Sequence, residues 1–330
     1  MTALRARKPT GNVAWPLVLV EGPEKSGKSY VSFSLSASEK VGRTFVFDFG
    51  EGAADEYAAL GRYEVVDHDG TYTDFIGQLA AAMAEPSDPD RPNVIVIDSG
   101  TILWELLKNW ASARARRSKA NKALLAQDPD AEINVSSTYW NDANDRWGRM
   151  VHMFRTWNGI GVIICRAKEV SKMGRDGNPV AGQTEYRVEG QKMLPYNVSA
   201  QIRCHGPRRA SLVAVRSLAV EVPPAGMDLP EQAPLERVVF DILGAGAPFG
   251  LSSAVEGQIG RPVAAAKNEL VDVFVRAGFD PENARTLASE AWRASAISSA
   301  HCASDTSSDA QWAELMAAAT VTIGEQEHAA

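Results

Sequence analysis

One short segment near the N-terminus combines glycines, a lysine and a hydroxyl residue at a fixed spacing. It fits the pattern GxxxxGK[ST] and consists of Gly22, Pro23, Glu24, Lys25, Ser26, Gly27, Lys28 and Ser29. Glycines let backbone N–H groups surround a phosphate, while Lys28 supplies charge to the β- and γ-phosphates and Ser29 offers a hydroxyl to magnesium. The segment follows a predicted strand, Trp15–Glu21, and opens a predicted helix near Lys28, as a phosphate loop requires. The sequence therefore predicts a site for ATP and Mg²⁺.

A carboxylate ends a second predicted strand. Four aliphatic residues, 94–97, precede Asp98, and such a run is typical of a parallel strand buried on both faces. The carboxyl ends of parallel strands face one crevice of the sheet. Asp98 is therefore predicted to hold magnesium with Ser29, mostly through water. The competing interpretation is an aspartate that only caps the following helix.

Hydrolysis needs a group that orients the attacking water, and no glutamate follows Asp98 directly. Glu51 is the preferred candidate because it lies just past the predicted strand Thr44–Asp48, whose end should face the same crevice. Asp48 is the second candidate. The alternative is that both are ordinary carboxylates of a charged turn.

Arg166 follows the predicted strand Gly161–Cys165. A polar residue at this strand end could act as a sensor of the γ-phosphate. An exposed arginine that opens a loop is the equally simple alternative.

The predicted elements that position these residues belong to an α/β fold. Strands and helices alternate first, and clustered short strands follow, so we expect a mostly parallel central sheet with an antiparallel extension. Further strands are predicted near 199–204, 211–221 and 236–241, an exposed or partly helical insertion at 112–137, and a mobile segment at 170–193.

The chain is expected to divide into four parts. These are an N-terminal arm, 1–12, an ATPase core, 13–248, a small helical region, 249–300, and a tail rich in Ala and Ser, 301–330. The helical region is predicted to hold a helix pair, Ala264–Ala277 and Pro281–Ala296, and the tail one short helix around Trp312.

Composition limits the class of protein. Lys and Arg number 34 and Asp and Glu 41, a net charge of −7, which disfavours tight non-specific nucleic-acid binding but allows a local basic groove. Cys165, Cys204 and Cys302 form no CxxC pair and are expected to be reduced and buried. No apolar run approaches the roughly 20 residues of a membrane span, and no secretion signal is evident. A cytoplasmic location without a membrane partner is expected.

Three segments together resemble RecA-like recombinases. The phosphate loop shares the Gly-Pro-Glu opening, Phe47–Tyr57 is similar to the segment with the catalytic glutamate, and Val94–Ser99 is similar to the magnesium strand. The resemblance covers roughly residues 12–222. It is closest to phage-encoded RecA-like ATPases that act with single-strand-binding protein in annealing and recombination. It implies a RecA-like P-loop NTPase core and, for a phage protein, the host cytoplasm.

The resemblance also implies roles for single residues. Glu51 corresponds to the catalytic glutamate, Asp55 to an aspartate four residues later in the nucleotide site, and Tyr57 to a tyrosine that stacks on adenine. Arg216 lies near the position that supplies a cation to the ATP of a neighbouring subunit. The family's sensor is a polar amide, whereas this chain has Cys165 and Arg166 there.

Two basic segments lie where the family has its DNA-binding loops. The first contains Arg114, Arg116, Arg117, Lys119 and Lys122. The second, 167–193, contains Lys168, Lys172, Arg175, Arg187 and Lys192, with Asp176–Pro179 at the second loop. The alternatives are a solvated helix face and a flexible surface loop.

These observations lead to one preferred function and two alternatives. We expect an ATPase that forms ADP and phosphate, is stimulated by single-stranded DNA in recombination, annealing or repair, and works as a homo-oligomer with single-strand-binding protein. A P-loop kinase or nucleotide-metabolism enzyme would use 112–137 as a lid over a small substrate. A nucleotide-dependent scaffold would bind ATP with little hydrolysis.

Overall fold

A computed structural model describes residues 6, 8–174, 177–246, 261–294, 306–307, 315–317 and 319. The chain forms two compact units, Met1–Phe249 and Gly250–Ala330. Each unit is described by itself below.

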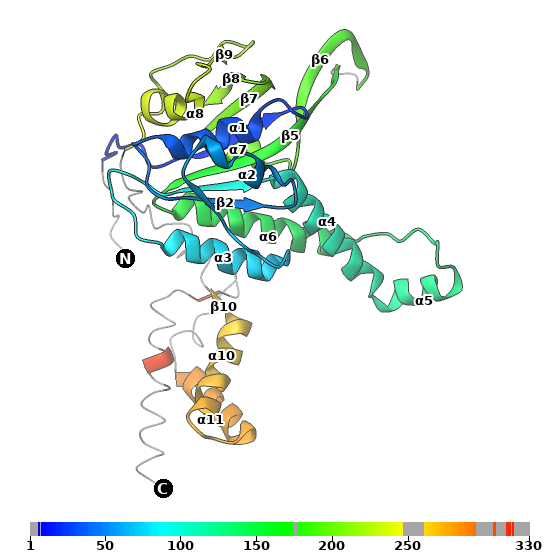
Figure 1. Ribbon diagram of the computed structural model, residues 1–330. Helices are drawn as coiled ribbons and strands as arrows, with labels where there is room; N and C mark the ends of the chain where they lie inside the picture. Colours follow the sequence, from blue (N-terminus) through cyan, green and yellow to red (C-terminus); the bar gives the residue numbers. More distant parts are fainter. Residues whose placement is uncertain are drawn as a thin grey trace. The chain divides into compact units, whose positions relative to one another are not determined.

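A nine-stranded sheet forms the centre of the first unit (Figure 1). Its strands are β1 (Leu17–Gly22), β2 (Thr44–Asp48), β3 (Tyr63–Val65), β4 (Val94–Asp98), β5 (Ile160–Met173), β6 (Pro179–Glu189), β7 (Ala200–Gly206), β8 (Arg209–Val215) and β9 (Met227–Asp228). The order is β3-β2-β4-β5-β1-β7-β8-β9, and β6 pairs with β5. Strands β3 to β7 along this order are parallel, whereas β6, β8 and β9 pair antiparallel. The prediction of an α/β fold with a mostly parallel sheet and an antiparallel extension is confirmed.

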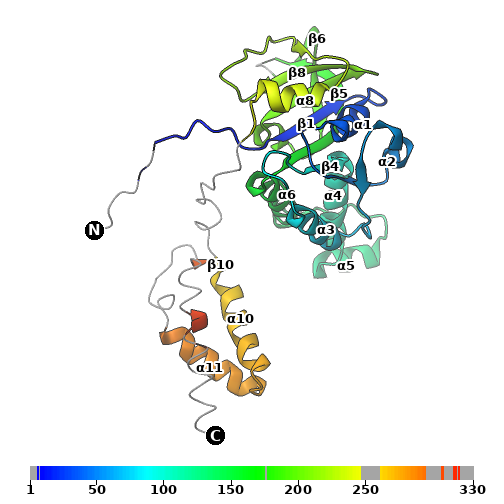
Figure 2. The same cartoon turned by 60° about the vertical axis from the view of Figure 1, so that its left-hand side comes forward.

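Helices cover both faces of the sheet (Figures 1 and 2). They are α1 (Lys28–Phe33), α2 (Ala53–Glu56), α3 (Tyr72–Ala84), α4 (Gly100–Arg116), α5 (Lys119–Gln127), α6 (Ser137–Thr156), α7 (Leu194–Asn197) and α8 (Pro234–Glu236), with a π-helix at Arg237–Ile242 and short 3₁₀ turns at Ser34–Ala37 and Ala58–Leu60. Helices α3, α4 and α6 lie on one face, and α1 and α8 lie on the other.

The aliphatic runs of the central strands are buried because both faces are covered. In β4, Val94 and Val96 belong to the cluster on the α1 side, whereas Ile95 and Ile97 belong to the cluster on the α3–α4–α6 side. Alternate side chains of one strand thus supply two cores. This burial fixes the strand ends that carry the polar residues.

The structure differs from the predictions in two segments. Residues 170–193, predicted as a mobile segment without strands, contain much of a long β-hairpin, in which β5 and β6 pair from Arg166 with Glu189 to Met173 with Pro179. Most of its side chains are exposed, so the hydrophobic alternation that marks a half-buried strand is missing. The segment 236–241 is helical rather than extended, because Pro234 opens a helix whose apolar residues pack into the core. Short apolar runs do not distinguish strand from helix.

The second unit contains the predicted helix pair, α10 (Val263–Arg276) and α11 (Pro281–Ala294). The two helices meet at a turn where Gly278 has a φ of 96°. Phe274 and Leu287 are buried in its small core. Two short strands, β10 (Arg261–Pro262) and β11 (Thr306–Ser307), pair antiparallel. The helix predicted around Trp312 falls outside the described residues.

The cysteine prediction holds for the two thiols that the structure describes. Cys165 and Cys204 are free and buried, and burial raises the pKa of each to about 12. Cys302 lies outside the described part of the chain. Within that part, no helix combines the length and the apolarity that crossing a bilayer requires.

Candidate active site

The phosphate loop occupies the turn between β1 and α1. Lys25 and Gly27 have positive φ values of 54° and 89°, a backbone shape in which successive N–H groups point to a common centre. The Lys28 ammonium donates a hydrogen bond to the Pro23 carbonyl at 2.7 Å, so its charge lies within the loop. The geometry is that of an anion-binding nest with a cation in it.

Gly22 is needed because β7 passes very close to the start of the loop. A Cβ atom at Gly22 would lie 2.5 Å from the Cys204 carbonyl oxygen and 2.5 Å from Ser26 Oγ. We therefore expect Gly22→Ala to lower the free energy of unfolding by about 1–3 kcal/mol, measured by chemical denaturation. Gly77→Ala in α3, where a Cβ atom meets nothing within 4 Å, is the control and should be neutral or stabilising. An unchanged stability of Gly22→Ala would contradict the tight packing of loop and strand.

The two predicted magnesium ligands are in contact. Ser29 Oγ donates a hydrogen bond of 2.8 Å to Asp98 Oδ2. Ser29 lies in α1, which follows β1, whereas Asp98 ends β4, and β5 separates these two strands. Asp98 is 2% exposed, and burial raises its pKa to about 6; the hydrogen bond from Ser29 opposes this shift, and the charges of Asp48 and Glu51 add to it. A buried carboxylate beside a hydroxyl is a hard oxygen donor pair, which fits Mg²⁺.

Lys28 shares the surroundings of this pair. Burial lowers the pKa of Lys28, and the carboxylates of Asp98 and Glu51 oppose that shift. The ammonium is thus partly desolvated, and a charge in such surroundings attracts an anion more strongly than one in water.

Asp48 shapes the turn that presents Glu51. Its Oδ1 accepts the backbone N–H groups of Gly50, Glu51 and Gly52 at 2.8, 2.8 and 3.3 Å. Gly50 and Gly52 have φ values of 91° and 70°, so this tight turn needs both glycines. Asp48 does not line the pocket, whereas Glu51 does. Of the two candidates for the base, Glu51 is thus the one that lies at the pocket.

Glu51 is held by two partners, Arg166 on β5 and Ser99, which follows β4. Arg166 forms an ion pair with Glu51 Oε1 at 2.7 Å, and Ser99 Oγ donates to the same oxygen at 3.2 Å. Because β5 lies between β1 and β4, Arg166 reaches both the phosphate loop and the end of β4. The hydrogen bond to Glu51 raises the pKa of Arg166. The structure thus brings Glu51, Arg166 and Asp98 together.

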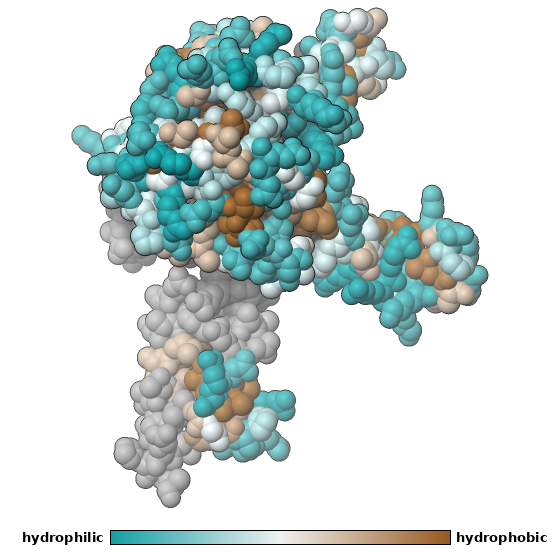
Figure 3. All heavy atoms as spheres, in the orientation of Figure 1, coloured by the Kyte–Doolittle hydropathy of each residue, from teal (hydrophilic) through white to brown (hydrophobic). Residues whose placement is uncertain are grey.

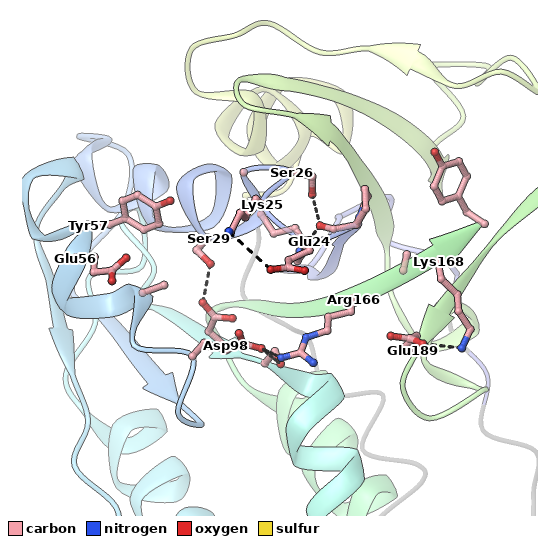
Figure 4. Close-up of a pocket in the computed structure, with 18 of the residues that line it drawn as sticks. Glu24, Lys25, Ser26, Ser29, Glu56, Tyr57, Asp98, Arg166, Lys168 and Glu189 are labelled. Atoms are coloured by element: carbon pink, nitrogen blue, oxygen red, sulfur yellow. Dashed lines mark hydrogen bonds and ion pairs between the residues drawn. The ribbon is translucent and has the colours of Figure 1, made fainter. Parts of the chain in front are cut away.

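These residues surround one pocket of about 890 Å³ (Figure 4). Its volume lies within the roughly 300–1,000 Å³ that small-molecule sites occupy. The loop residues Pro23 to Ser29 form one wall, and Tyr57 forms the side opposite Lys168. Tyr57 is 37% exposed and meets Phe33 edge-on at 6.4 Å, so its ring is supported from the core.

Asp55 is exposed and is not among the residues that line the pocket, whereas the next residue, Glu56, lines it beside Tyr57. Successive side chains of a helix point about 100° apart, so a shift of one residue in α2 changes which carboxylate faces the pocket. The role that the resemblance implies for Asp55 stays a prediction, and Glu56 is the acid of α2 that lines the pocket.

Several pocket residues were not anticipated as part of the nucleotide site. Lys168, Tyr186 and Glu189 come from the base of the β5–β6 hairpin. A sequence pattern that predicted this hairpin would have been needed to place them beside the phosphate loop.

Two residues with predicted roles do not line the pocket. Gly22 ends β1 at the start of the loop, and Arg216 directly follows β8.

The basic segment of the α4–α5 region lies away from the pocket, and Arg114 there pairs with Asp142 at 2.6 Å. The α5 projection carries mainly hydrophilic residues with some apolar ones on the side seen in Figure 3, and Leu124 is 41% exposed. Arg175 and Asp176 of the second basic segment fall outside the described residues.

A model of the AAA domain family matches residues 16–205, more than half of the chain. No significant match was found among curated proteins. The solved structure of the RadB recombinase is similar with 16% identity, covering 68% of this chain and 91% of that chain, at a TM-score of 0.34. An ATPase from the type III secretion system of pathogenic bacteria is similar with 12% identity, covering 93% and 80%, at a TM-score of 0.28. The family match, which includes the phosphate loop between β1 and α1, shows that the chain belongs to the AAA-domain family of P-loop ATPases.

Proposed function

We propose that this chain hydrolyses ATP in the pocket around the phosphate loop and uses the reaction in DNA recombination, annealing or repair on single-stranded DNA. The convergence of Lys28, the Ser29–Asp98 pair and Glu51 on one pocket supports hydrolysis. The resemblance of the three sequence segments to RecA-like recombinases supports the DNA role.

Each side chain has a distinct task in this proposal. Lys28 contacts the β- and γ-phosphates, and Ser29 and Asp98 would hold Mg²⁺, which neutralises charge on the transferred phosphoryl group when bound. Glu51 accepts a hydrogen bond from the attacking water and orients it. Arg166 fixes the Glu51 carboxylate through their 2.7 Å ion pair. Tyr57 offers its ring to the adenine.

The proposed partners are single-stranded DNA, single-strand-binding protein and further copies of this chain. In such an assembly ATP would lie at a junction between subunits, and Arg216 would supply a cation to the neighbour's site. A homo-oligomer of this kind is tested by the mass of the protein with and without ATP.

The deciding experiment is phosphate release with and without single-stranded DNA. Stimulation by DNA supports the proposed function. Transfer of the phosphoryl group to a small acceptor would instead indicate a P-loop kinase or nucleotide-metabolism enzyme. Tight ATP binding with neither result would indicate a nucleotide-dependent scaffold.

Lys28→Ala tests the phosphate loop directly. A hydrogen bond to a charged group is worth about 1.5–3 kcal/mol, so nucleotide affinity should fall by roughly 10- to 150-fold. A fluorescent ATP analogue measures this affinity. Lys40→Ala is the control, because Lys40 pairs with Glu236 and does not line the pocket. Equal affinity of Lys28→Ala and the parent would remove the loop from nucleotide binding.

A further inference from the structure

The turn that joins β7 to β8 packs against the phosphate loop. Gly206 and Arg209 pair across this hairpin, so Pro207 and Arg208 form a two-residue turn between them. A Cβ atom at Gly27 would lie 3.6 Å from the Gly206 carbonyl oxygen and 3.7 Å from the Arg208 nitrogen. These are van der Waals distances, so the backbone of the β7–β8 turn lies directly on the loop.

Arg208 has a backbone conformation that arginine rarely adopts. Its φ is 59°, and a left-handed residue after a proline is the pattern of a type II turn, which favours glycine at that position. Among the residues that the structure describes, two other non-glycine residues have positive φ, Lys25 of the phosphate loop and Ala233 before α8. Such conformations cost free energy and cluster at functional sites. Because the backbone favours glycine here, the reason for an arginine should lie in its side chain.

The Arg208 guanidinium lies over an aromatic ring of α1. Its central carbon is 5.7 Å from the centroid of the Tyr30 ring, and its Nη1 pairs with Glu231 at 3.2 Å. The side chains of Arg208 and Glu231 are 63% and 61% exposed, and an ion pair between such exposed groups is weak. The guanidinium can therefore leave Glu231 for a stronger partner while the β7–β8 turn stays in place.

The ring of Tyr30 lies next to the proposed place of the adenine. Tyr30 and Phe33 are three positions apart on α1 and are therefore neighbours on one side of the helix. Phe33 meets the ring of Tyr57 edge-on at 6.4 Å, and Tyr57 is the residue proposed to receive the adenine. Arg208 and Tyr57 thus contact neighbouring side chains of the helix that follows the phosphate loop.

We propose that Arg208 is a second residue that binds the nucleoside of ATP, with its guanidinium stacked on the base that Tyr57 receives, and that Glu231 competes with the nucleotide for it. A guanidinium is planar and weakly hydrated, and it stacks on flat rings. Arg208 is not among the residues that line the pocket, so its exposed side chain has to leave Glu231 to reach the base. The inference rests on the proposed function, because it adds a residue to the same nucleotide site. It also assigns a preference for purines, since a larger ring offers more area to stack.

The test measures the affinities of the full chain for ATP, CTP and inorganic tripolyphosphate by titration calorimetry. Arg208→Gly should weaken ATP binding by roughly 3- to 30-fold, as loss of one cation–π contact does, and should leave tripolyphosphate binding unchanged. The preference for ATP over CTP should shrink in the same variant. Arg62→Ala is the control, because Arg62 is 62% exposed, pairs with Glu39 at 2.8 Å and does not line the pocket. It should match the parent.

The stability of Arg208→Gly separates the side chain from the backbone. Glycine suits a left-handed position, so the thermal midpoint of this variant should equal or exceed that of the parent, although ATP binds more weakly. Arg208→Asn, whose side chain also tolerates this conformation, should repeat the loss of ATP affinity. A loss of affinity that follows a loss of stability in both variants would make Arg208 a structural residue and overturn the inference.

Glu231→Gln tests the competition for the guanidinium. Removal of the carboxylate should raise the ATP affinity of the parent by roughly 2- to 5-fold, as the weakness of the pair implies. The same change should have no effect when Arg208 is already glycine. An equal gain in both backgrounds would show that Glu231 acts without Arg208 and would exclude the exchange of partners.

Failure of this inference and failure of the proposed function give different results. If Lys28→Ala loses nucleotide while Arg208→Gly binds ATP as tightly as the parent, Arg208 has no part in the site and the proposed function stands. Equal losses of affinity for ATP and tripolyphosphate in Arg208→Gly would place Arg208 on the phosphates and overturn the contact with the base. A parent that neither binds nor hydrolyses ATP overturns both proposals.

Discussion

Glu51→Gln is expected to lower the rate of ATP hydrolysis by roughly 100- to 10,000-fold, because a positioned base contributes about that much. Glutamine has nearly the shape of glutamate and can still accept hydrogen bonds from Arg166 and Ser99, but it is a far weaker acceptor for the proton of the attacking water. Nucleotide affinity should stay close to that of the parent, since Lys28 and the Ser29–Asp98 pair remain. Phosphate release at saturating ATP and binding of a fluorescent ATP analogue measure the two quantities.

Asp48→Asn is the matched comparison for this prediction. It changes a carboxylate on the same turn that binds backbone N–H groups and does not line the pocket. We expect its main effect on the thermal midpoint, through a loosened turn, whereas Glu51→Gln should leave the midpoint unchanged. Full turnover in Glu51→Gln would exclude Glu51 as the base.

Asp98→Asn is expected to stabilise the nucleotide-free protein while abolishing its magnesium-dependent affinity for ATP. The ionised carboxylate is buried, and its pKa rises from 3.8 to about 6 on folding. One pKa unit corresponds to 1.36 kcal/mol, so ionised Asp98 costs about 3 kcal/mol of stability above pH 6. Asparagine removes this cost and can still accept the Ser29 hydroxyl. Urea denaturation at pH 8 should show the gain.

The gain in the free energy of unfolding of Asp98→Asn over the parent should depend on pH in a defined direction. An acid whose folded pKa is raised binds a proton more tightly when folded, so its contribution to stability is fully present below pH 3.8 and is lost as the pH rises through 6. The advantage of Asp98→Asn over the parent should therefore grow between pH 4 and pH 6 and vanish at lower pH. A gain that is independent of pH, or a loss at pH 8, would show that Asp98 is not an ionised, buried group.

The phosphate loop and the strand ending at Asp98 could be predicted because contiguous patterns encode them. Val94–Asp98 is buried on both faces as its aliphatic run implies, and the loop lies between strand and helix as its pattern requires. Glu51 could be placed because strand ends meet at one edge of a parallel sheet.

Other parts of the site depend on geometry that no local pattern carries. The ion pair of Arg166 with Glu51 joins residues 115 positions apart, one on β5 and one in the turn after β2. Which acid of α2 faces the pocket depends on the rotation of a four-residue helix, so Glu56 rather than Asp55 lines it. The β5–β6 hairpin has two largely exposed faces, and its sequence therefore shows no apolar alternation from which to predict strands.

The length of β5 has a mechanical consequence. Its first residues are buried between β1 and β4, and the same strand runs on into the exposed hairpin without glycine or proline from Val162 to Ser171. The hairpin is therefore anchored at its base in the middle of the sheet, and this stretch of β5 contains no residue that would act as a hinge. A force applied to the hairpin is transmitted along the strand that carries Arg166 and so reaches the pocket from a distance.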